Sequence, residues 1–316
     1  MLLNFDSDMS NHHSRRESSR NVQLANSKPE QDSRIMIAMV GVTGAGKTTF
    51  ASLASGTREP MAIEFMLDSR QIVLIDTPGF DDDMRSDLVI LEDIAKWMAK
   101  KGYLKNHLLD GLIFLHPVML NRVGGSERNR TRLLQAILGK DAYSRVIIAT
   151  TFWGSIKSEE EINRWLDGRK SVGGVWHEMI QHGAKVMKHS NDAMSAHNII
   201  GEIIKITDEN GKLEPLLRKE LKNHKGRVIK TSAGKELERQ VMKDIVSLDR
   251  KLEEHEKDRP PDSDGRDKDL EVREKYKIWH RDKQMMEDRL QRRKKQLKKL
   301  GSLVIRIKTF LASIFG

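Results

Sequence analysis

The segment from Gly41 to Thr48 constrains the fold of this 316-residue chain more than any other. It reads Gly-Val-Thr-Gly-Ala-Gly-Lys-Thr, follows an apolar run at 35–40 and opens a helix-like stretch at 49–54. A strand, a glycine-rich turn and a helix start, in this order, let the backbone curl until its amide hydrogens face an anion. The pattern therefore predicts a phosphate-binding loop at the carboxyl end of a strand.

Two side chains of this loop and a second motif predict a site for Mg²⁺. Lys47 can reach the terminal phosphates of a nucleotide, and the Thr48 hydroxyl can ligate Mg²⁺. The motif Asp76-Thr77-Pro78-Gly79 closes an apolar run at 72–75, 29 residues after Lys47. In folds with such a loop, an acidic residue that ends a neighbouring strand holds Mg²⁺ directly or through water. We expect Thr48 and Asp76 to serve the metal, and the Gly79 amide to meet the γ-phosphate.

Short β-branched runs alternate with helical patterns over residues 35–206. The expected strands span 35–40, 62–67, 71–76, 111–116, 145–150 and 184–188. The expected helices span 48–56, 86–101, 126–139, 158–167 and 192–206. Several strands are apolar on both faces, as in a sheet covered by helices on both sides. The link at 68–70 has hairpin length, which predicts one antiparallel edge strand. The predicted fold class is α/β, with a doubly wound, mostly parallel sheet.

Composition divides the chain into four predicted regions. Residues 1–33 are polar and aperiodic and are expected to be disordered. Residues 34–208 form the predicted P-loop NTPase domain, 209–300 a charged helical or coiled-coil extension, and 301–316 an amphipathic helix. The net charge of +10 belongs to the extension, because residues 211–316 hold 30 Lys and Arg against 19 Asp and Glu. Nucleic acid, an anionic membrane and an acidic partner all fit this charge, and a solvated helix surface is the favoured interpretation.

The extension carries a helical pattern that leaves its assembly open. An apolar stripe at spacings of three and four comprises Leu237, Val241, Ile245, Leu248 and Leu252. A turn at 259–265 containing Pro260-Pro261 interrupts it, and a second helix is expected over 266–300. The apolar residues on one side of that helix are Tyr276, Trp279, Met286, Leu290, Leu297 and Leu300. The two helices could form an antiparallel hairpin, a coiled coil with a second copy, or a layer on the domain.

The last residues, 303–316, are apolar and follow the basic run at 292–299. An interfacial membrane anchor and a helix docked on protein both fit this pattern. No apolar run reaches the roughly 18 residues of a membrane span, and the first six residues are too short and acidic for a signal peptide. The expected location is cytoplasmic, with peripheral membrane contact as the variant. Nucleic-acid binding is disfavoured, because Tyr276 and Trp279 lie at helical spacing and not as a stacking platform.

The phosphate loop followed by Asp76–Gly79 resembles the switch-type GTPases. With Phe80-Asp81-Asp82, Trp153-Gly154 and the segment 176–186, residues 35–206 resemble fungal G-domain proteins related to the AIG-type, immune-associated GTPases and, more distantly, septins. The resemblance implies a GTP- and GDP-binding protein that uses Mg²⁺ and associates in a nucleotide-dependent way. The loop residues implied to hold the nucleotide are Gly41, Val42, Thr43, Gly44, Ala45, Gly46, Lys47, Thr48 and Thr49.

The expected base-reading motif is absent. Guanine-binding domains usually carry Asn-Lys-x-Asp after the fifth strand, whereas this chain has Thr151-Phe152-Trp153-Gly154 there. Thr150 or Thr151 could make a weaker polar contact, and Trp153 could stack near the base. Simple packing of Phe152 and Trp153 is the slightly favoured alternative. Residues 188–191, after the sixth strand, are positioned to line the base pocket.

The first switch is short. After helix and strand are placed between Lys47 and Asp76, little more than the segment 56–60 remains, with Thr57 as its candidate Mg²⁺ ligand. We expect impaired γ-phosphate sensing or slow hydrolysis.

No catalytic base is evident from the sequence. His116 at a strand end and Arg122 as a charge-stabilising finger, in cis or across a dimer, are weak candidates, and Asp81, Asp82 and Asp83 fit a solvated loop better. The leading interpretation is a GTP-binding switch with slow hydrolysis, whose helical tail or G domain supports homo-oligomerisation. A hydrolysis-deficient nucleotide-binding scaffold and a P-loop ATPase are the alternatives.

Overall fold

A computed structural model describes residues 34–55, 63–76, 87–99, 109–120, 123–155, 158–260 and 270–303. Its strands are β1 (Ile35–Gly41), β2 (Ile63–Leu67), β3 (Arg70–Asp76), β4 (Gly111–Pro117), β5 (Val146–Thr151) and β6 (Lys185–Lys188). The helices of the first part are α1 (Lys47–Ser55), α2 (Asp87–Ala99), α3 (Gly125–Leu138), α4 (Glu159–Lys170), α5 (His177–Gln181) and α6 (Ala193–Asn210). Three more follow: α7 (Leu216–Asn223), α8 (Ser232–Lys257) and α9 (Leu270–Ser302).

The described strands form one sheet in the order β2-β3-β1-β4-β5-β6. All neighbouring pairs are parallel except β2 with β3, which confirms the predicted antiparallel edge strand. Its hairpin turns at Asp68 and Ser69, whose φ angles of 46° and 63° suit a tight two-residue connection. The register sets Met39 of β1 opposite Asp76 of β3, so the two predicted motifs end at the same edge of the sheet.

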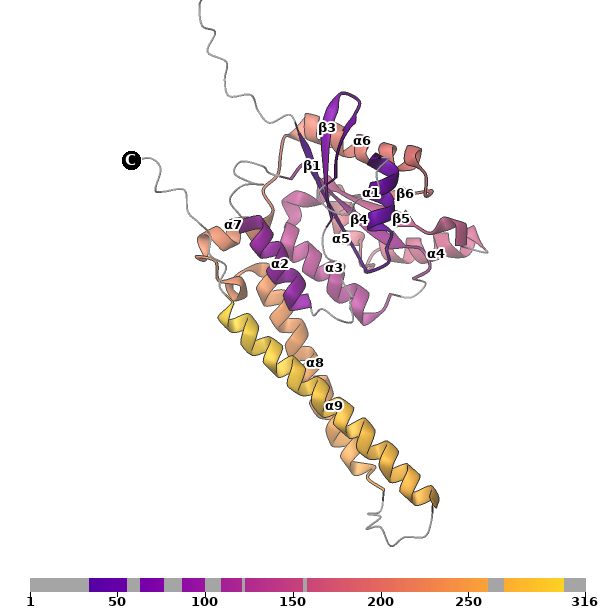
Figure 1. Ribbon diagram of the computed structural model, residues 1–316, viewed down its shortest axis with the longest axis vertical. Helices are drawn as coiled ribbons and strands as arrows, with labels where there is room; N and C mark the ends of the chain where they lie inside the picture. The colour runs from indigo at the N-terminus through magenta and orange to yellow at the C-terminus, as the bar shows by residue number, and fades with distance from the viewer. Residues whose placement is uncertain are drawn as a thin grey trace, which may run out of the picture. The chain divides into compact units, whose positions relative to one another are not determined.

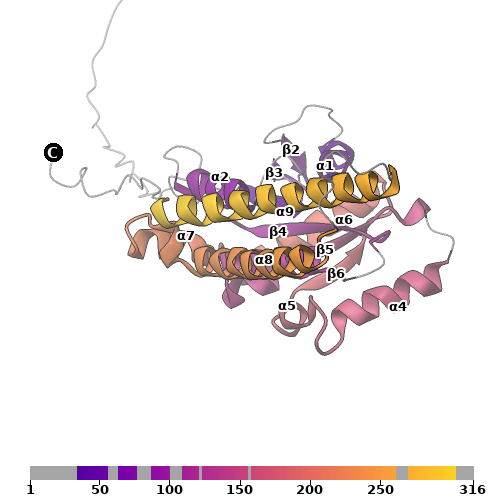
Figure 2. The same ribbon diagram turned by 90° about the horizontal axis from the view of Figure 1, so that it is seen from below.

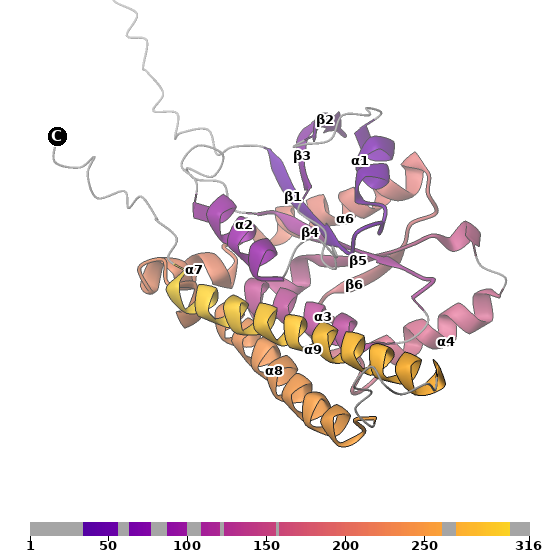
Figure 3. The same ribbon diagram turned by 60° about the horizontal axis from the view of Figure 1, so that its bottom comes forward.

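The sheet is buried on both faces, as its apolar strands predict. Alternate residues of β1 enter different cores: Met36, Ala38 and Val40 enter one and Ile35, Ile37 and Met39 the other. Figure 3 shows α1 and α6 on one side of the sheet and α2 and α3 on the other. The α1 side is closed by Phe50 and by Ile199, Ile200 and Ile203 of α6. The structure therefore has the doubly wound α/β architecture expected of a P-loop NTPase.

Caps fix the ends of several helices where the sequence changes character. The Ser158 hydroxyl accepts the Glu161 amide at the start of α4, and the Asp192 carboxylate accepts the Ser195 amide at the start of α6. Thr231 caps α8 in the same way. Each side chain satisfies an amide that has no partner within its helix. Helices α5 and α7 and the continuation of α6 to Asn210 lie outside the helices expected from the sequence.

Helices α8 and α9 form an antiparallel hairpin, which confirms one of the three arrangements expected for the extension. Figures 1 and 2 show them side by side. Near the turn, Trp279 Nε1 donates to the His255 carbonyl at 2.9 Å, and the two rings stack 5.3 Å apart. Farther along, Arg293 Nη2 lies 2.9 Å from Asp244 Oδ2. In these pairs the residue number increases along α9 while it decreases along α8, so the two helices are antiparallel.

The hairpin also packs on the domain, so the third arrangement is confirmed together with the first. Leu237, Val241, Ile245 and Leu248 of the predicted stripe are buried in the core that includes α2 and α3. Gln240 Nε2 donates to the Asn129 carbonyl of α3 at 2.8 Å. A coiled coil with a second copy stays a prediction. The predicted disordered segment 1–33 and most of the predicted helix 301–316 lie outside the described residues. Within the described part of the chain, no helix has the length and hydropathy needed to cross a bilayer.

Candidate nucleotide-binding site

The predicted phosphate loop joins the end of β1 to the start of α1. Gly44 and Gly46 have φ angles of 77° and 92°, a region that residues with a side chain rarely adopt. A Cβ on Gly41 would lie 2.7 Å from the Leu115 carbonyl oxygen. The Ala45 amide donates to the Val42 carbonyl at 3.0 Å, which closes the turn. Sterics therefore explain why glycine occupies positions 41, 44 and 46. The loop has the curled backbone that the pattern predicts.

Lys47 folds back over this loop. Its Nζ donates to the carbonyl oxygens of Gly41 and Val42 at 3.4 and 3.3 Å. Burial lowers the pKa of Lys47, while the charge of Asp76 acts in the opposite direction. Burial likewise raises the pKa of Asp76, against the effect of Lys47. The two partly dehydrated charges therefore stabilise each other at the point where a phosphate and a metal ion would enter.

The donor set beside Lys47 fits Mg²⁺. Thr48 is an exposed residue in the first turn of α1. Asp76 lies at the carboxyl end of β3, where its side chain is accessible to solvent although the surrounding residues partly dehydrate its carboxylate. A hydroxyl and a carboxylate are hard oxygen ligands, and Mg²⁺ commonly takes one or two protein ligands together with phosphate oxygens and water. Thr43 and Thr49 are also exposed, whereas Ala45 is buried and holds the loop against the core. Gly79, Thr57, Arg122 and Asp81–Asp83 lie outside the described residues.

A cavity of about 380 Å³ continues from the phosphate loop along the sheet edge. Gly46 and Thr49 contribute to its wall from the loop and α1. The other walls come from the ends of β5 and β6: Thr151, Phe152, Trp153, Gly154, His189, Ser190 and Asn191. These two segments follow neighbouring parallel strands, so their side chains meet at the carboxyl edge of the sheet. A ligand in this cavity would contact the phosphate loop at one end.

Phe152 is an exposed wall of this cavity and not a packed core residue, so the favoured packing interpretation is wrong for it. Its side chain is 40% exposed, and its φ of 66° is unusual for an aromatic residue. Its ring edge lies 3.8 Å from where a Cβ on Gly46 would be. The left-handed backbone turns the ring out of the core and toward the glycine loop, where it can cover a planar group.

Thr150, Thr151 and Trp153 brace the cavity. Thr151 Oγ1 donates to the Ala45 carbonyl at 3.1 Å, which ties the end of β5 to the phosphate loop. Thr150 Oγ1 donates to the Met187 carbonyl, and Trp153 Nε1 donates to the Thr150 carbonyl at 3.0 Å. These bonds use the hydroxyl hydrogens of both threonines, so a contact of either hydroxyl with a base stays a prediction and would have the oxygen as acceptor. Trp153 is only partly buried, with the Lys188 ammonium 4.4 Å from its ring centroid.

His189 is a lining residue of the cavity that the sequence did not single out by itself. The residue is 3% exposed, and its Nδ1 shares a hydrogen with Ser195 Oγ at 2.8 Å. Its Nε2 is buried without a hydrogen-bond partner among the described residues. Burial lowers the pKa of His189, so the ring is neutral near pH 7. A buried ring nitrogen without a partner is costly, and a bound polar edge would remove that cost.

His116, the other weak catalytic candidate, is a core residue. It is 3% exposed, and its ring lies edge-on to Trp176 with centroids 4.8 Å apart. Burial lowers its pKa to about 3, with Arg169 and Arg130 contributing. Its Nε2 lies 3.9 Å from the carboxylate of Glu127, which forms a buried ion pair with Arg169. A neutral imidazole enclosed in this way is not placed to orient a water molecule, so the catalytic interpretation is corrected to a packing role.

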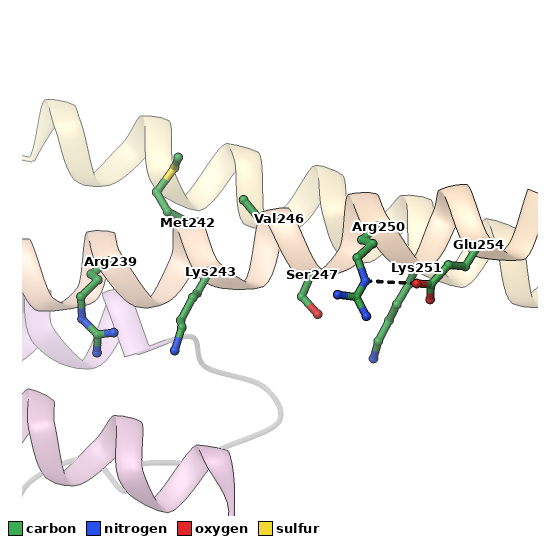
Figure 4. Close-up of a pocket in the computed structure, with 8 residues that line it drawn as sticks. All are labelled: Arg239, Met242, Lys243, Val246, Ser247, Arg250, Lys251 and Glu254. Atoms are coloured by element: carbon green, nitrogen blue, oxygen red, sulfur yellow. Dashed lines mark hydrogen bonds and ion pairs between the residues drawn. The ribbon is translucent and has the colours of Figure 1, made fainter.

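A second hollow lies on the outer face of α8 (Figure 4). Met242 and Val246 are 44% and 64% exposed there, and Arg250 pairs with Glu254 along the helix. All the residues around this hollow come from one helix. It therefore has no second wall and lacks the convergent polar groups of a small-molecule site.

Comparison with known proteins gives similarities of fold only. No protein-family model and no curated relative matches the sequence. Toc33 from Arabidopsis thaliana, solved with Mg²⁺ and GMPPNP, is 13% identical and superposes with a TM-score of 0.47 over 57% of this chain and 87% of its own. The G domain of the T. maritima FeoB iron transporter is 18% identical, with a TM-score of 0.35 over 55% and 99% of the two chains. The elongation factor SelB from Methanococcus maripaludis is 16% identical, with a TM-score of 0.37 over 57% and 34%. The sheet order and the loop geometry themselves show a P-loop NTPase fold of the G-domain type.

Proposed function

We propose that the protein binds a guanine nucleotide with Mg²⁺ across this site. The observation that supports this proposal most directly is that the phosphate loop is continuous with the 380 Å³ cavity. Gly46 and Thr49 belong to both. The phosphates would lie over the amides from Gly41 to Thr49, with Lys47 on the terminal phosphates. Thr48 and Asp76 would hold Mg²⁺, which screens the phosphate charge when bound. The base would enter the cavity beside Phe152.

Guanine is favoured over adenine by the polar groups of the cavity, although no carboxylate lines it. Phe152 can cover either base, since stacking does not distinguish them. His189 Nε2, Ser190 and Asn191 can hydrogen-bond the base edge. The neutral ring of His189 carries one N–H, so Nε2 would donate to guanine O6 in one tautomer and accept guanine N1–H in the other. The discrimination that such neutral bonds provide is smaller than that of a charged acceptor. We therefore propose a GTP and GDP preference that is weaker than that of a typical G domain.

Equilibrium binding tests this proposal. Fluorescent GTP, GDP and ATP analogues would be titrated with and without Mg²⁺ into the full chain and into Lys47→Ala. Lys185→Ala is the matched control, because Lys185 is an exposed lysine on β6 outside the cavity. GTP-selective, Mg²⁺-dependent binding that only Lys47→Ala abolishes supports the proposal. Equal binding of ATP and GTP favours the P-loop ATPase alternative, and no binding to any nucleotide refutes nucleotide recognition altogether.

Slow hydrolysis is the second part of the proposal. The described residues of the site contain no candidate base, since His116 is enclosed in the core. Release of phosphate from GTP would be followed over hours at saturating nucleotide. Turnover that exceeds the Lys47→Ala background supports a slow GTPase, whereas binding without turnover supports the nucleotide-binding scaffold.

The relation to AIG-type and septin-like GTPases, association between copies through the G domain or the hairpin, cytoplasmic location and peripheral membrane contact of the C-terminal segment are further parts of this proposal. They rest on the sequence patterns described above. Light scattering of the GDP and GTP-analogue forms would test the association, with a nucleotide-dependent mass as the expected result.

A further inference from the structure

A small polar cavity lies between α3 and the turn that precedes α5, apart from the nucleotide cavity. Its volume is about 170 Å³, and Arg128, Thr131, Arg132 and Gln135 line it from α3. The turn Gly173–Val175 forms the facing wall, with Glu178 at its side. None of these residues lines the 380 Å³ cavity. One water takes up roughly 30 Å³ of liquid, so this space holds a small polyatomic ion but is too small for a nucleotide.

The two arginines of this cavity lie one helical turn apart and lack close acidic partners. Among the described residues, the guanidinium groups of Arg128 and Arg132 form no hydrogen bond and no ion pair within 4.0 Å. Arg132 acts only at longer range on Glu236, whose carboxylate is already paired with Arg239. Residues at i and i+4 project from the same face of a helix. Their guanidinium groups can therefore converge on one anion in the cavity.

Thr131 lies between the arginines and gives the second, independent sign of a ligand. It is 1% exposed, and its Oγ1 is buried with no hydrogen-bond partner in the described structure. Leaving a hydroxyl unpaired in the interior typically costs about 1–3 kcal/mol. An oxyanion in the adjoining cavity would accept its hydrogen and remove that cost.

The facing turn adds backbone donors. Gly173 has a φ of 82°, and Gly174 packs so closely on the Arg169 carbonyl that a side chain there would clash. The Gly174 amide donates to the Ser171 carbonyl, whereas the Val175 amide has no acceptor among the described residues. Glycine turns with left-handed residues form concave amide surfaces that bind anions. This wall therefore complements the cationic wall on α3.

Glu178 does not cancel this positive character. Its carboxylate is 44% exposed, and its Oε1 lies 2.7 Å from Lys140 Nζ, so its charge is already balanced at the rim. Arg128 and Arg132 are exposed residues, so their two charges lie at the open wall of the cavity and leave it with an excess of positive charge. Guanidinium groups match phosphate and similar oxyanions through paired N–H donors.

We propose that this cavity is a binding site for a tetrahedral oxyanion, inorganic phosphate or the head of a small phosphomonoester, held by Arg128, Arg132 and the Thr131 hydroxyl. The site is independent of the proposed nucleotide site, because the two cavities share no residue. The site would bind a dianion through hydrogen bonds and charge, without forming a covalent bond.

Residue-resolved NMR of the full chain separates this site from the phosphate loop, which could also take up phosphate. Amide shifts of Gly173, Gly174 and Val175 would be followed while phosphate, glycerol phosphate or acetate is added at constant ionic strength. We expect saturable shifts with phosphate or the phosphomonoester, and none with acetate. Tighter binding of the free ion would assign the site to phosphate, and tighter binding of the ester would assign it to a phosphorylated metabolite or headgroup. Equal response to acetate, or no saturation, would overturn the proposal.

Matched variants complete the test. Arg128→Gln with Arg132→Gln should weaken phosphate binding at these amides by about 30-fold or more, because the variant removes both charged donors from the site. Arg289→Gln with Arg292→Gln removes the same charge from exposed positions on α9 and should leave the affinity unchanged. Thr131→Val should weaken binding about fivefold while the fold stays at least as stable in urea, since it removes an unpaired hydroxyl. Equal weakening by both arginine pairs would reduce the effect to net charge and refute the site.

Discussion

The two ends of the proposed nucleotide site are built in different ways. At the phosphate end, a continuous segment from Gly41 to Thr49 forms the site through its own backbone, with Asp76 as the outside contribution. At the base end, side chains from two separate segments meet, Phe152 after β5 and His189–Asn191 after β6. The phosphate end therefore depends on glycines and amides, and the base end on side chains that a sequence can exchange. In the proposed function, this difference would let the chain bind phosphates without the carboxylate that usually reads guanine.

The strongest test of the phosphate end is Lys47→Ala. We expect GDP and GTP affinity to fall about 100-fold or more, because the substitution removes a charged, partly dehydrated donor from the terminal phosphates. Isothermal titration with unlabelled nucleotide would measure it. The loss should be similar for guanine and adenine nucleotides. A loss confined to one base would contradict the division of the site into two ends.

The base end should respond most to Phe152→Ala. Stacking of a base on an aromatic ring contributes about 1–3 kcal/mol, so we expect roughly a tenfold loss of GDP affinity. Affinity for pyrophosphate, which lacks a base, should not change. Met66→Ala is the control, because Met66 is an exposed apolar residue on β2, 64% accessible. Weaker pyrophosphate binding in Phe152→Ala would show that the ring supports the loop and does not cover a base.

As the pH is lowered, the contribution of Mg²⁺ to GDP affinity should fall before the affinity measured without Mg²⁺ does. Burial raises the pKa of Asp76, so its carboxylate takes up a proton at a higher pH than an ordinary aspartate and releases Mg²⁺. The ratio of GDP affinities with and without Mg²⁺ should begin to fall as the pH approaches the raised pKa from above and should be severalfold lower once the pH is below it. Asp76→Asn should lose the Mg²⁺ dependence at all pH values. A ratio independent of pH would argue against Asp76 as the metal ligand.

Unfolding must be monitored in that experiment. Burial lowers the pKa of His116 to about 3, so the folded state stays unprotonated there while the unfolded chain binds a proton below about pH 6.5. Between about pH 6.5 and pH 3 the unfolded state therefore binds more protons than the folded state, so the free energy of unfolding decreases as the pH falls through this range. Circular dichroism at each pH separates loss of fold from loss of Mg²⁺.

The smallest expected effect concerns base choice. His189→Phe keeps a ring of similar size but removes the unpaired Nε2, and Asn191→Ala removes an amide from the cavity wall. Each should lower the GDP-to-ADP affinity ratio about three- to fivefold, as expected for one neutral hydrogen bond. Competition titrations with the two nucleotides would measure the ratio. An unchanged ratio in both variants would leave base choice to the backbone of the cavity.

The sequence predicted the parts that follow from local rules. The strands, the antiparallel edge, the loop and the placement of Asp76 depend on periodicity and short motifs, and the structure confirms them. Phe152 was misassigned because its exposure results from one residue with a φ of 66°, which no local pattern marks. His116 and the Arg128–Arg132 cavity depend on which side chains meet across α3, α4 and the turn at 173–175, and spacing along the chain does not show such contacts.

The most direct test of the central claim is an NMR titration that observes both ends of the site at once. GDP with Mg²⁺ should shift the amides of Gly44 and Gly46 and those of Phe152 and Asn191 with one common dissociation constant. Pyrophosphate should shift the first pair alone. That result would show one nucleotide spanning the phosphate loop and the adjoining cavity. GDP that leaves the loop amides unmoved, or that shifts the two pairs with different dissociation constants, would contradict the account.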